Sequence, residues 1–323
     1  MLKFLYYYLR SMRLYYGFVT ATTVLAGLYY WHWFGFRADA MGRPAGWTLR
    51  DAALLAMGFF AWGFNQIFSD WCDRKEDAIN APHRPMVTGA LKPLPAFAVS
   101  AAGLAAIAVA GYLMSPWTLA FLALGGALNI AYSLLKRVPV LNCLVYACAI
   151  SCCALFAIAG AGNRCPTPGE FGFVAVWILP VHFLMCHNSY YKDVRGDRAA
   201  GVRTLQTSCH RYVAELVSIA FAGLATFAAG IMHGEGPQKV VHLGDHVVVF
   251  VHHANVLVIL ILAIAVAFQR SVEKMKYHRA TCLNCQLCVL LLHLHFFKAS
   301  WPYAVASLVA IQLLFLWYRD EKE

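Results

Sequence analysis

Charged residues are scarce in this sequence. They make up 13% of its 323 residues, whereas hydrophobic residues make up 61%. This composition excludes an ordinary soluble domain and is typical of a protein that crosses the membrane many times. The formal net charge is +10, but the basic residues lie between apolar stretches and form no single basic stripe. The sequence therefore predicts a lipid bilayer as a partner and no nucleic acid.

Apolar stretches recur along the whole chain. Each contains roughly 20 residues, enough for a helix to cross a hydrocarbon core of about 30 Å. We expect an all-α fold, a multi-pass transmembrane helical bundle of nine or ten spans with a central cavity open to the cytoplasmic face. The last two stretches form either two spans or one kinked element. The expected spans are 14–34, 49–68, 96–114, 117–135, 138–162, 171–190, 212–232, 247–268, 282–297 and 303–317.

The positions of the basic residues predict the orientation in the membrane. Lysine and arginine precede the first expected span and follow the second, fourth, sixth and eighth. Because cytoplasmic loops are enriched in these residues, we expect the amino terminus and these loops on the cytoplasmic side. We do not expect the first apolar stretch to be a cleaved secretory signal, because many others follow it and no small-residue cleavage site is evident.

The eleven cysteines show no disulfide framework, since most lie inside expected spans. Cys282, Cys285 and Cys288 have a spacing that could serve a metal. Residues three apart on a helix can equally form a packing face, and no fourth ligand accompanies them. The sequence leaves the role of these three cysteines open.

Acidic residues concentrate at two places, and the first is the end of the second expected span. Asp70, Asp73 and Asp77 are spaced by three and four residues, so on a helix their carboxylates project from one face. Asn65 and Ser69 continue this face deeper into the span. Ionisable groups at membrane depth require partners or a function, so we expect a functional site here.

The second acidic place follows four spans later, at the end of the sixth. Asp193 and Asp197 are four residues apart and share a helical face. The chain therefore resembles a weak internal duplication. We expect one transmembrane domain over 1–323, with half-bundles 1–162 and 163–323 that each carry one acidic motif, 69–77 and 193–197.

Carboxylates this close repel one another unless cations intervene. Oxygen-only ligands suit Mg²⁺, which is commonly shared between carboxylates and substrate phosphates. Arg74, Arg84, Lys192 and Arg203 lie within or just beyond the two acidic places and could pair with phosphate oxygens. The sequence thus predicts a diphosphate site, although solvated charged helix ends are the alternative.

These motifs resemble the UbiA superfamily of intramembrane prenyltransferases. Residues 69–77 match its first motif, Asn-Asp-x-x-Asp-x-x-x-Asp, except that Ser69 replaces the leading Asn, and the loop to Gly89 is similar to the segment that follows. Asp193 and Asp197, with the Gly and Thr residues downstream of them, match the second motif. Tyr132-Ser133 with Lys136-Arg137 and Leu141-Asn142 is similar to a third family segment.

The resemblance implies a magnesium-dependent enzyme that transfers a prenyl chain from a prenyl diphosphate to a hydrophobic acceptor, aromatic or lipid-like. A terpene cyclase of the same fold and a membrane transporter are the alternatives. The expected catalytic residues are Asp70, Asp73, Asp77, Asp193 and Asp197, with Ser69 joining them as magnesium ligands. Diphosphate contacts are expected from Arg74, Arg84, Lys192 and Arg203, and tail or acceptor contacts from Asn65, Tyr132, Lys136 and Tyr190.

Overall fold

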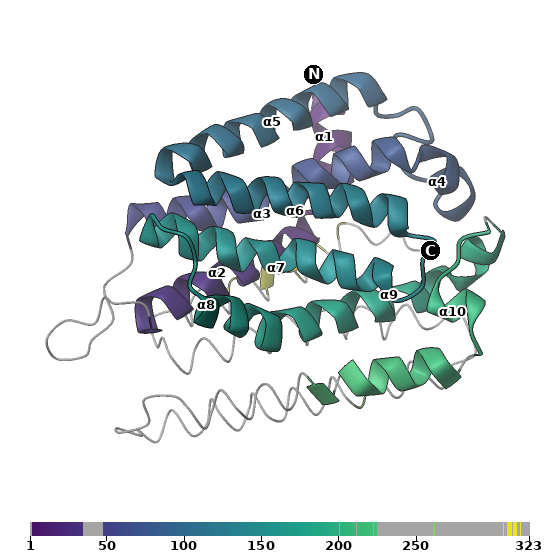
Figure 1. Cartoon of the computed structure of the whole chain (residues 1–323). Coiled ribbons are helices and arrows are strands. Elements are labelled where there is room, and N and C mark those ends of the chain that lie inside the picture. The colour runs from purple at the N-terminus through teal and green to yellow at the C-terminus, as the bar shows by residue number, and fades with distance from the viewer. Residues whose placement is uncertain are drawn as a thin grey trace, which may run out of the picture. The chain divides into compact units, whose positions relative to one another are not determined.

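The computed structural model describes residues 2–34, 48–199, 201–210, 212–221 and 223–224, together with 261, 306, 309–311, 313–314 and 317. Every element among them is helical and none is a strand, as predicted (Figure 1). The chain divides into two compact units. The expected spans beyond 224, including the three cysteines near 285, lie almost wholly outside the described residues.

The first unit comprises Met1–Ala123, Cys153–Cys165 and Ala306–Glu323. Helix α3 lies beside both α2 and α5, and the short α1 packs on α3 (Figure 1). Helices α6 and α7 run through both units. The elements are α1 (Leu2–Ser11), η1 (Leu14–Tyr16), α2 (Gly17–Phe34), α3 (Leu49–Cys72), α4 (Arg74–Asn80), α5 (Pro93–Met114), α6 (Pro116–Leu135) and α7 (Leu141–Gly162).

Small residues let the helices of this unit approach closely. A Cβ atom on Gly27 of α2 would lie 2.3 Å from the backbone oxygen of Ala154 in α7. The hydroxyl of Thr20 donates to the backbone oxygen of Gly58 in α3, at 2.7 Å. Close backbone contact and interhelical hydrogen bonds are the interactions expected to hold helices together in lipid, where the hydrophobic effect between them is weak.

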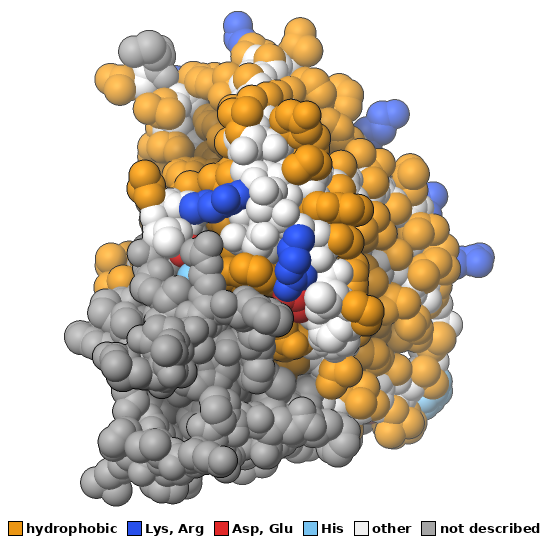
Figure 2. Space-filling model, turned by 60° about the vertical axis from the view of Figure 1, so that its left-hand side comes forward, with side chains coloured by type: hydrophobic (Ala, Val, Ile, Leu, Met, Phe, Trp, Pro, Cys, Tyr) orange, Lys and Arg blue, Asp and Glu red, His pale blue; other side chains and the backbone are white. Residues whose placement is uncertain are grey.

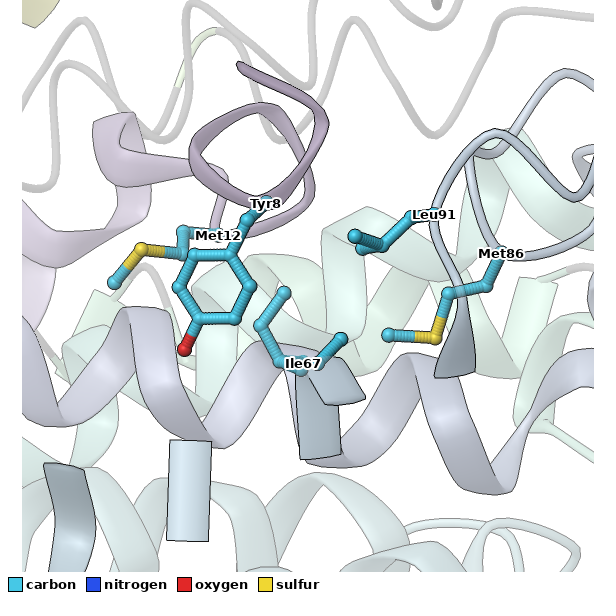
Figure 3. Packing of buried hydrophobic residues seen from close by; sticks show 6 residues of the cluster. Tyr8, Met12, Ile67, Met86 and Leu91 are labelled. Atoms are coloured by element: carbon cyan, nitrogen blue, oxygen red, sulfur yellow. The ribbon is translucent and has the colours of Figure 1, made fainter. Parts of the chain in front are cut away.

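A hydrophobic cluster fixes the end of α3 that carries the first acidic motif. Ile67 of α3 is fully buried between Tyr8 and Met12 on one side and Met86 and Leu91 on the other (Figure 3). The cluster thus joins α1, α3 and the segment that follows α4. It positions the basic residues of these segments relative to Asp70, which follows Ile67 by one turn.

The second unit comprises Leu124–Cys152 and Pro166–Val305. A capping box between Thr167 and Glu170 starts a continuous helical run. This run consists of α8 (Pro168–Phe173), a wider helical turn η2 (Val174–Ile178) and α9 (Leu179–Ala199), and α10 (Leu205–Ser208) then packs on α9. A core cluster between α7 and α9 consists of Cys143, Ala147, Phe183, Cys186 and Tyr190.

Five described helices are long and apolar enough to cross a membrane: Leu49–Cys72, Pro93–Met114, Pro116–Leu135, Leu141–Gly162 and Pro168–Tyr191. Their outward side chains are apolar, with Leu113 78% and Leu134 79% exposed. Hydrophobic side chains also cover most of the described surface in Figure 2, where Lys and Arg are few. Such a surface is stable in lipid and not in water. The number of nine or ten spans stays a prediction.

Candidate functional site

The first acidic motif lies where α3 leaves its span. The spacing of the three aspartates had suggested one uninterrupted helix. The structure instead ends α3 at Cys72 and begins α4 at Arg74. Asp73 forms the junction with φ −86° and ψ 9°, although its backbone N–H still reaches the Ser69 oxygen at 2.9 Å. Asp70 and Asp77 are buried, and Asp73 is half-buried. The break separates Asp70 on α3 from Asp77 on α4.

Two arginines bind these buried carboxylates. The Arg13 guanidinium donates from Nη2 to Asp70 Oδ1 at 3.0 Å and lies 3.4 Å from Oδ2. Arg84 Nη1 lies 3.5 Å from Asp70 Oδ1 and forms a close ion pair with Asp77. The side-chain amide of Gln66, one turn before Asp70, donates to Asp70 Oδ1 at 2.9 Å. We call these five residues the charged set.

Sequence reasoning had assigned Arg84 to this site but had used Arg13 only to predict topology. Arg13 lies 57 positions before Asp70, just after α1. Its own backbone φ is 47°, in the left-handed region. Few non-glycine residues adopt this conformation, and surrounding contacts must hold such a residue in place. The contact between Arg13 and Asp70 is one of them. No motif spacing links Arg13 to Asp70, and the α1–α3 packing brings them together.

Burial governs the electrostatics of Asp77. Desolvation is the main cause that raises the pKa of this carboxyl, the charge of Asp70 adds to it and Arg84 opposes it, and the pKa is about 6 as a result. Two buried carboxylates and two guanidinium groups make the charged set formally neutral. A neutral set of this kind avoids the cost of an isolated charge at low dielectric.

The other residues expected near the first motif are half-buried or exposed. Ser69 and Asn65 are half-buried on α3. Arg74 is exposed, donates from Nε to the Trp71 backbone oxygen at 2.9 Å, and stacks 5.4 Å from the Trp71 ring centre. The structure therefore places Arg74 against the end of α3, whereas Arg84 reaches the carboxylates.

The second acidic motif ends α9. Asp197 is buried at 3% exposure, whereas the side chains of Lys192 and Asp193 lie outside what the structure describes. The chain reverses at Gly201, whose φ of +69° suits glycine, and the Val202 N–H donates to the Asp197 backbone oxygen at 2.8 Å. Arg203 follows and is exposed.

A buried polar clamp holds this helix end to the segment after it. The Gln206 side-chain amide donates to the His187 backbone oxygen at 2.9 Å, and His187 Nε2 lies 2.9 Å from the Ala214 backbone oxygen. Thr207 accepts at Oγ1 from the Thr204 N–H at 2.8 Å, which begins α10. These bonds join α9, α10 and the helical segment 212–221. Sequence reasoning did not identify Gln206 or His187.

Two residues expected at the tail or acceptor site meet in the second unit. The hydroxyl oxygens of Tyr132 on α6 and Tyr190 on α9 are 2.8 Å apart. Tyr132 is half-buried and its ring lies 5.4 Å from that of Tyr146. Lys136, also half-buried, follows the end of α6, and its backbone oxygen accepts from Asn142 at 3.4 Å.

The donor atoms at both motifs are of the kind that magnesium prefers. Asp70, Asp73, Asp77 and Asp197 supply carboxylate oxygens. Among the described side chains, no three His, Cys, Asp or Glu residues cluster closely enough to hold a metal by themselves. The residues fit magnesium chemistry, and the side chain of Asp193 lies beyond the described ones.

Comparison with known proteins shows the family. A model described as the UbiA prenyltransferase family matches residues 38–274. The bacteriochlorophyll synthase 33 kDa chain of Rhodobacter capsulatus is 28% identical over 190 residues, 55% of this chain and 62% of that protein. The digeranylgeranylglyceryl phosphate synthase of Natronomonas pharaonis is 33% identical over 150 residues, 45% of this chain and 52% of that protein.

Solved structures share the fold. A UbiA homologue from Aeropyrum pernix in its apo form has a TM-score of 0.67 at 15% identity, covering 88% of this chain and 97% of its own. One from Archaeoglobus fulgidus, bound to GPP and Mg²⁺, has a TM-score of 0.63 at 14% identity, covering 94% and 99%. The family match extends over most of the sequence and includes both acidic motifs. This chain is therefore an integral membrane protein that belongs to the UbiA prenyltransferase family.

Proposed function

We propose that this chain is a magnesium-dependent intramembrane prenyltransferase, which transfers the hydrocarbon chain of a prenyl diphosphate to an aromatic or lipid-like acceptor. Family membership supports the reaction class. The relatives it matches are named as synthases, but the matched part spans only 52% to 62% of their lengths. The observation that carries the proposal is the charged set, in which buried Asp70 and Asp77 are bound by Arg13 and Arg84.

The charged set suits a site that exchanges partners. Guanidinium groups bind carboxylates and phosphates with similar planar geometry, so Arg13 and Arg84 can turn from carboxylate oxygens to phosphate oxygens. Asp70 and Asp77 then become free to ligate a cation. After this exchange the arginines are paired with phosphate and the aspartates with the cation, so no buried charge lacks a counter-charge. This lowers the free-energy cost of breaking the ion pairs of the charged set.

Magnesium would be held by Asp70, Asp73, Asp77, Asp193 and Asp197, with Ser69 as a further oxygen ligand; when bound, it supplies positive charge that stabilises the departing diphosphate. The arginines add fixed donors to the same anion. Arg84 is the leading phosphate contact because it already lies against the two buried carboxylates of the first motif, Asp70 and Asp77. Lys192, Arg74 and Arg203 are proposed to contact the diphosphate when it is bound.

The apolar spans would keep water from the allylic cation and take up the prenyl tail. Asn65, Tyr132, Lys136 and Tyr190 are proposed to contact the tail or the acceptor. We further propose nine or ten spans in two half-bundles, 1–162 and 163–323, with a central cavity, the amino terminus and the active-site loops on the cytoplasmic side. The basic residues beside both motifs support this orientation.

Purified protein in lipid nanodiscs tests the function. It is incubated with geranyl, farnesyl or geranylgeranyl diphosphate, Mg²⁺ and a membrane extract, and pyrophosphate release and product masses are measured. Release that requires Mg²⁺ and a prenylated product support the proposal. A cyclic hydrocarbon formed without extract would instead identify a terpene cyclase. Magnesium-dependent pyrophosphate release would exclude a transporter, whereas no release from any of the three diphosphates would count against both enzymes.

Asp73→Ala and Asp197→Ala are the matched variants, one in each motif. Both are expected to insert normally and to lose turnover, because each removes one proposed magnesium ligand. Full activity in both would refute the metal assignment. Membrane insertion is checked by recovery of each variant in the washed membrane fraction, and folding by size-exclusion chromatography of the purified protein.

A further inference from the structure

Helix α1 exposes apolar side chains on one side. Leu2, Leu5 and Tyr6 are 80%, 48% and 43% exposed, and residues three and four apart share a helical face. Lys3, beside Leu2, is exposed as well. Apolar side chains are more stable away from water, whereas a lysine keeps its charged end in a polar layer. This face therefore fits the boundary between an apolar and a polar environment.

The opposite side of α1 is packed against other helices. Tyr8 and Ser11 are buried, and the Tyr8 hydroxyl lies 2.7 Å from the Ser100 hydroxyl of α5. Tyr8 and Met12 also pack on Ile67 of α3 (Figure 3). These contacts fix how α1 is rotated about its own axis. The outer face therefore cannot turn inward to bury its leucines.

The position of α1 identifies the surroundings of its outer face. Arg13, two residues after α1, binds Asp70 at the end of α3, so α1 lies where this span leaves the membrane. Figure 1 shows α1 running across the direction of α3 and α5. A helix that crosses a span at its end lies along the membrane surface, where apolar side chains reach acyl chains and a lysine reaches phosphate groups. The Tyr6 ring, 6.1 Å from the Trp317 ring, suits this level, because aromatic side chains are enriched there.

We propose that α1 is an interfacial helix, which inserts Leu2 and Leu5 into the phospholipid leaflet on the side of the first acidic motif and extends Lys3 to the lipid phosphates. The partner of this face is the phospholipid leaflet itself. Because Arg13 comes two residues after α1, insertion also restrains the residue that binds Asp70. The leaflet thus helps to hold the charged set in place, a role that does not depend on which reaction the chain catalyses.

Photolabelling in lipid nanodiscs tests the insertion. The full-length protein is reconstituted with a phosphatidylcholine that carries a diazirine on its acyl chain, irradiated and digested, and labelled peptides are identified by mass. We expect label on residues 2–11, and about tenfold less when Leu2→Gln and Leu5→Gln are combined, because an amide side chain is costly in hydrocarbon. Leu94→Gln is the matched control, since Leu94 is 72% exposed on α5. It should leave the label on residues 2–11 unchanged.

Thermal melting in the same nanodiscs tests the restraint on Arg13. The combined leucine variant is expected to lower the melting temperature by about 2–4 °C, and by less when Arg13→Gln is also present, because the restraint then has no guanidinium to hold. Label on α5 without label on residues 2–11 would overturn the insertion, and would indicate that water or a protein partner covers this face. Equal losses of melting temperature with and without Arg13 would overturn the restraint.

Discussion

The two acidic helix ends are built from similar sequence but stabilise their polar groups differently. At the first, Asp70 and Asp77 are surrounded by Arg13 and Arg84, so that opposite charges balance in a buried place. At the second, described hydrogen bonds of α9 join uncharged groups: the Tyr132–Tyr190 hydroxyl pair and the clamp formed by Gln206 on His187.

The comparison teaches how one motif spacing can serve two roles. A set of opposite charges can exchange its partners for phosphate and metal at low cost, because every charge retains a counter-charge. A neutral, hydrogen-bonded set cannot exchange in this way, but it holds its groups in one geometry. We infer that the first end reorganises on binding, whereas the second is preorganised.

The largest expected effect comes from removing a carboxylate at either end. Asp70→Asn and Asp197→Asn should each lower turnover by about a thousandfold, because each removes a proposed metal ligand. Asp70→Asn should also lower the free energy of unfolding by about 3 kcal/mol, since it leaves two partly buried guanidinium groups short of charge. Pyrophosphate release and thermal melting measure the two effects. Unchanged melting of Asp70→Asn would contradict the role of the charged set.

The two arginines of the charged set should differ in how much they contribute to kcat/KM. Arg84 lies within ion-pair distance of both Asp70 and Asp77, and Arg13 forms its ion pair with Asp70. We therefore expect Arg84→Gln to lower kcat/KM for the prenyl diphosphate about a hundredfold and Arg13→Gln about tenfold. Arg10→Gln is the control, because Arg10 donates to the Tyr6 hydroxyl at the helix surface. Equal losses in all three variants would indicate a general charge effect.

Glutamine residues provide a further comparison between the ends. Gln206 is buried and holds His187, whereas Gln66 is half-buried and donates to Asp70. Gln206→Ala should lower the free energy of unfolding by about 1–2 kcal/mol, and Gln66→Ala by less than about 1 kcal/mol. Thermal or denaturant melting in detergent measures both. The reverse order would mean that the second end is not the more rigidly held one.

The smallest expected effect concerns the two serines that begin residues 69–77 and 189–197, which both carry aspartate at their fifth and ninth positions. Ser69→Asn restores the residue of the family motif and should lower the Mg²⁺ concentration for half-maximal activity by about twofold to threefold. Ser189→Asn should change it little, because the Ser189 hydroxyl donates to the Cys186 backbone oxygen of its own helix at 2.6 Å. Magnesium titration of pyrophosphate release distinguishes them, and equal responses would break the comparison.

Much of the architecture could be predicted from local patterns. The apolar stretches 49–68 and 138–162 correspond to α3 and α7, because a run of about 20 apolar residues has few other stable states in lipid. The helix interruption at Asp73 could not be predicted from the spacing of three and four residues, which an unbroken helix also satisfies. Span counts beyond residue 224 stay predictions.

Composition and periodicity are local properties, and they are sufficient to predict a helical, apolar chain with two acidic helix ends. The sequence also contains Asp70 in the first motif and Tyr190 at the corresponding position of the second. The groups that neutralise or orient these side chains depend on tertiary packing, because Arg13 reaches Asp70 across 57 residues and Tyr132 reaches Tyr190 across 58. Contacts at such separations depend on how helices pack, and no motif spacing encodes them.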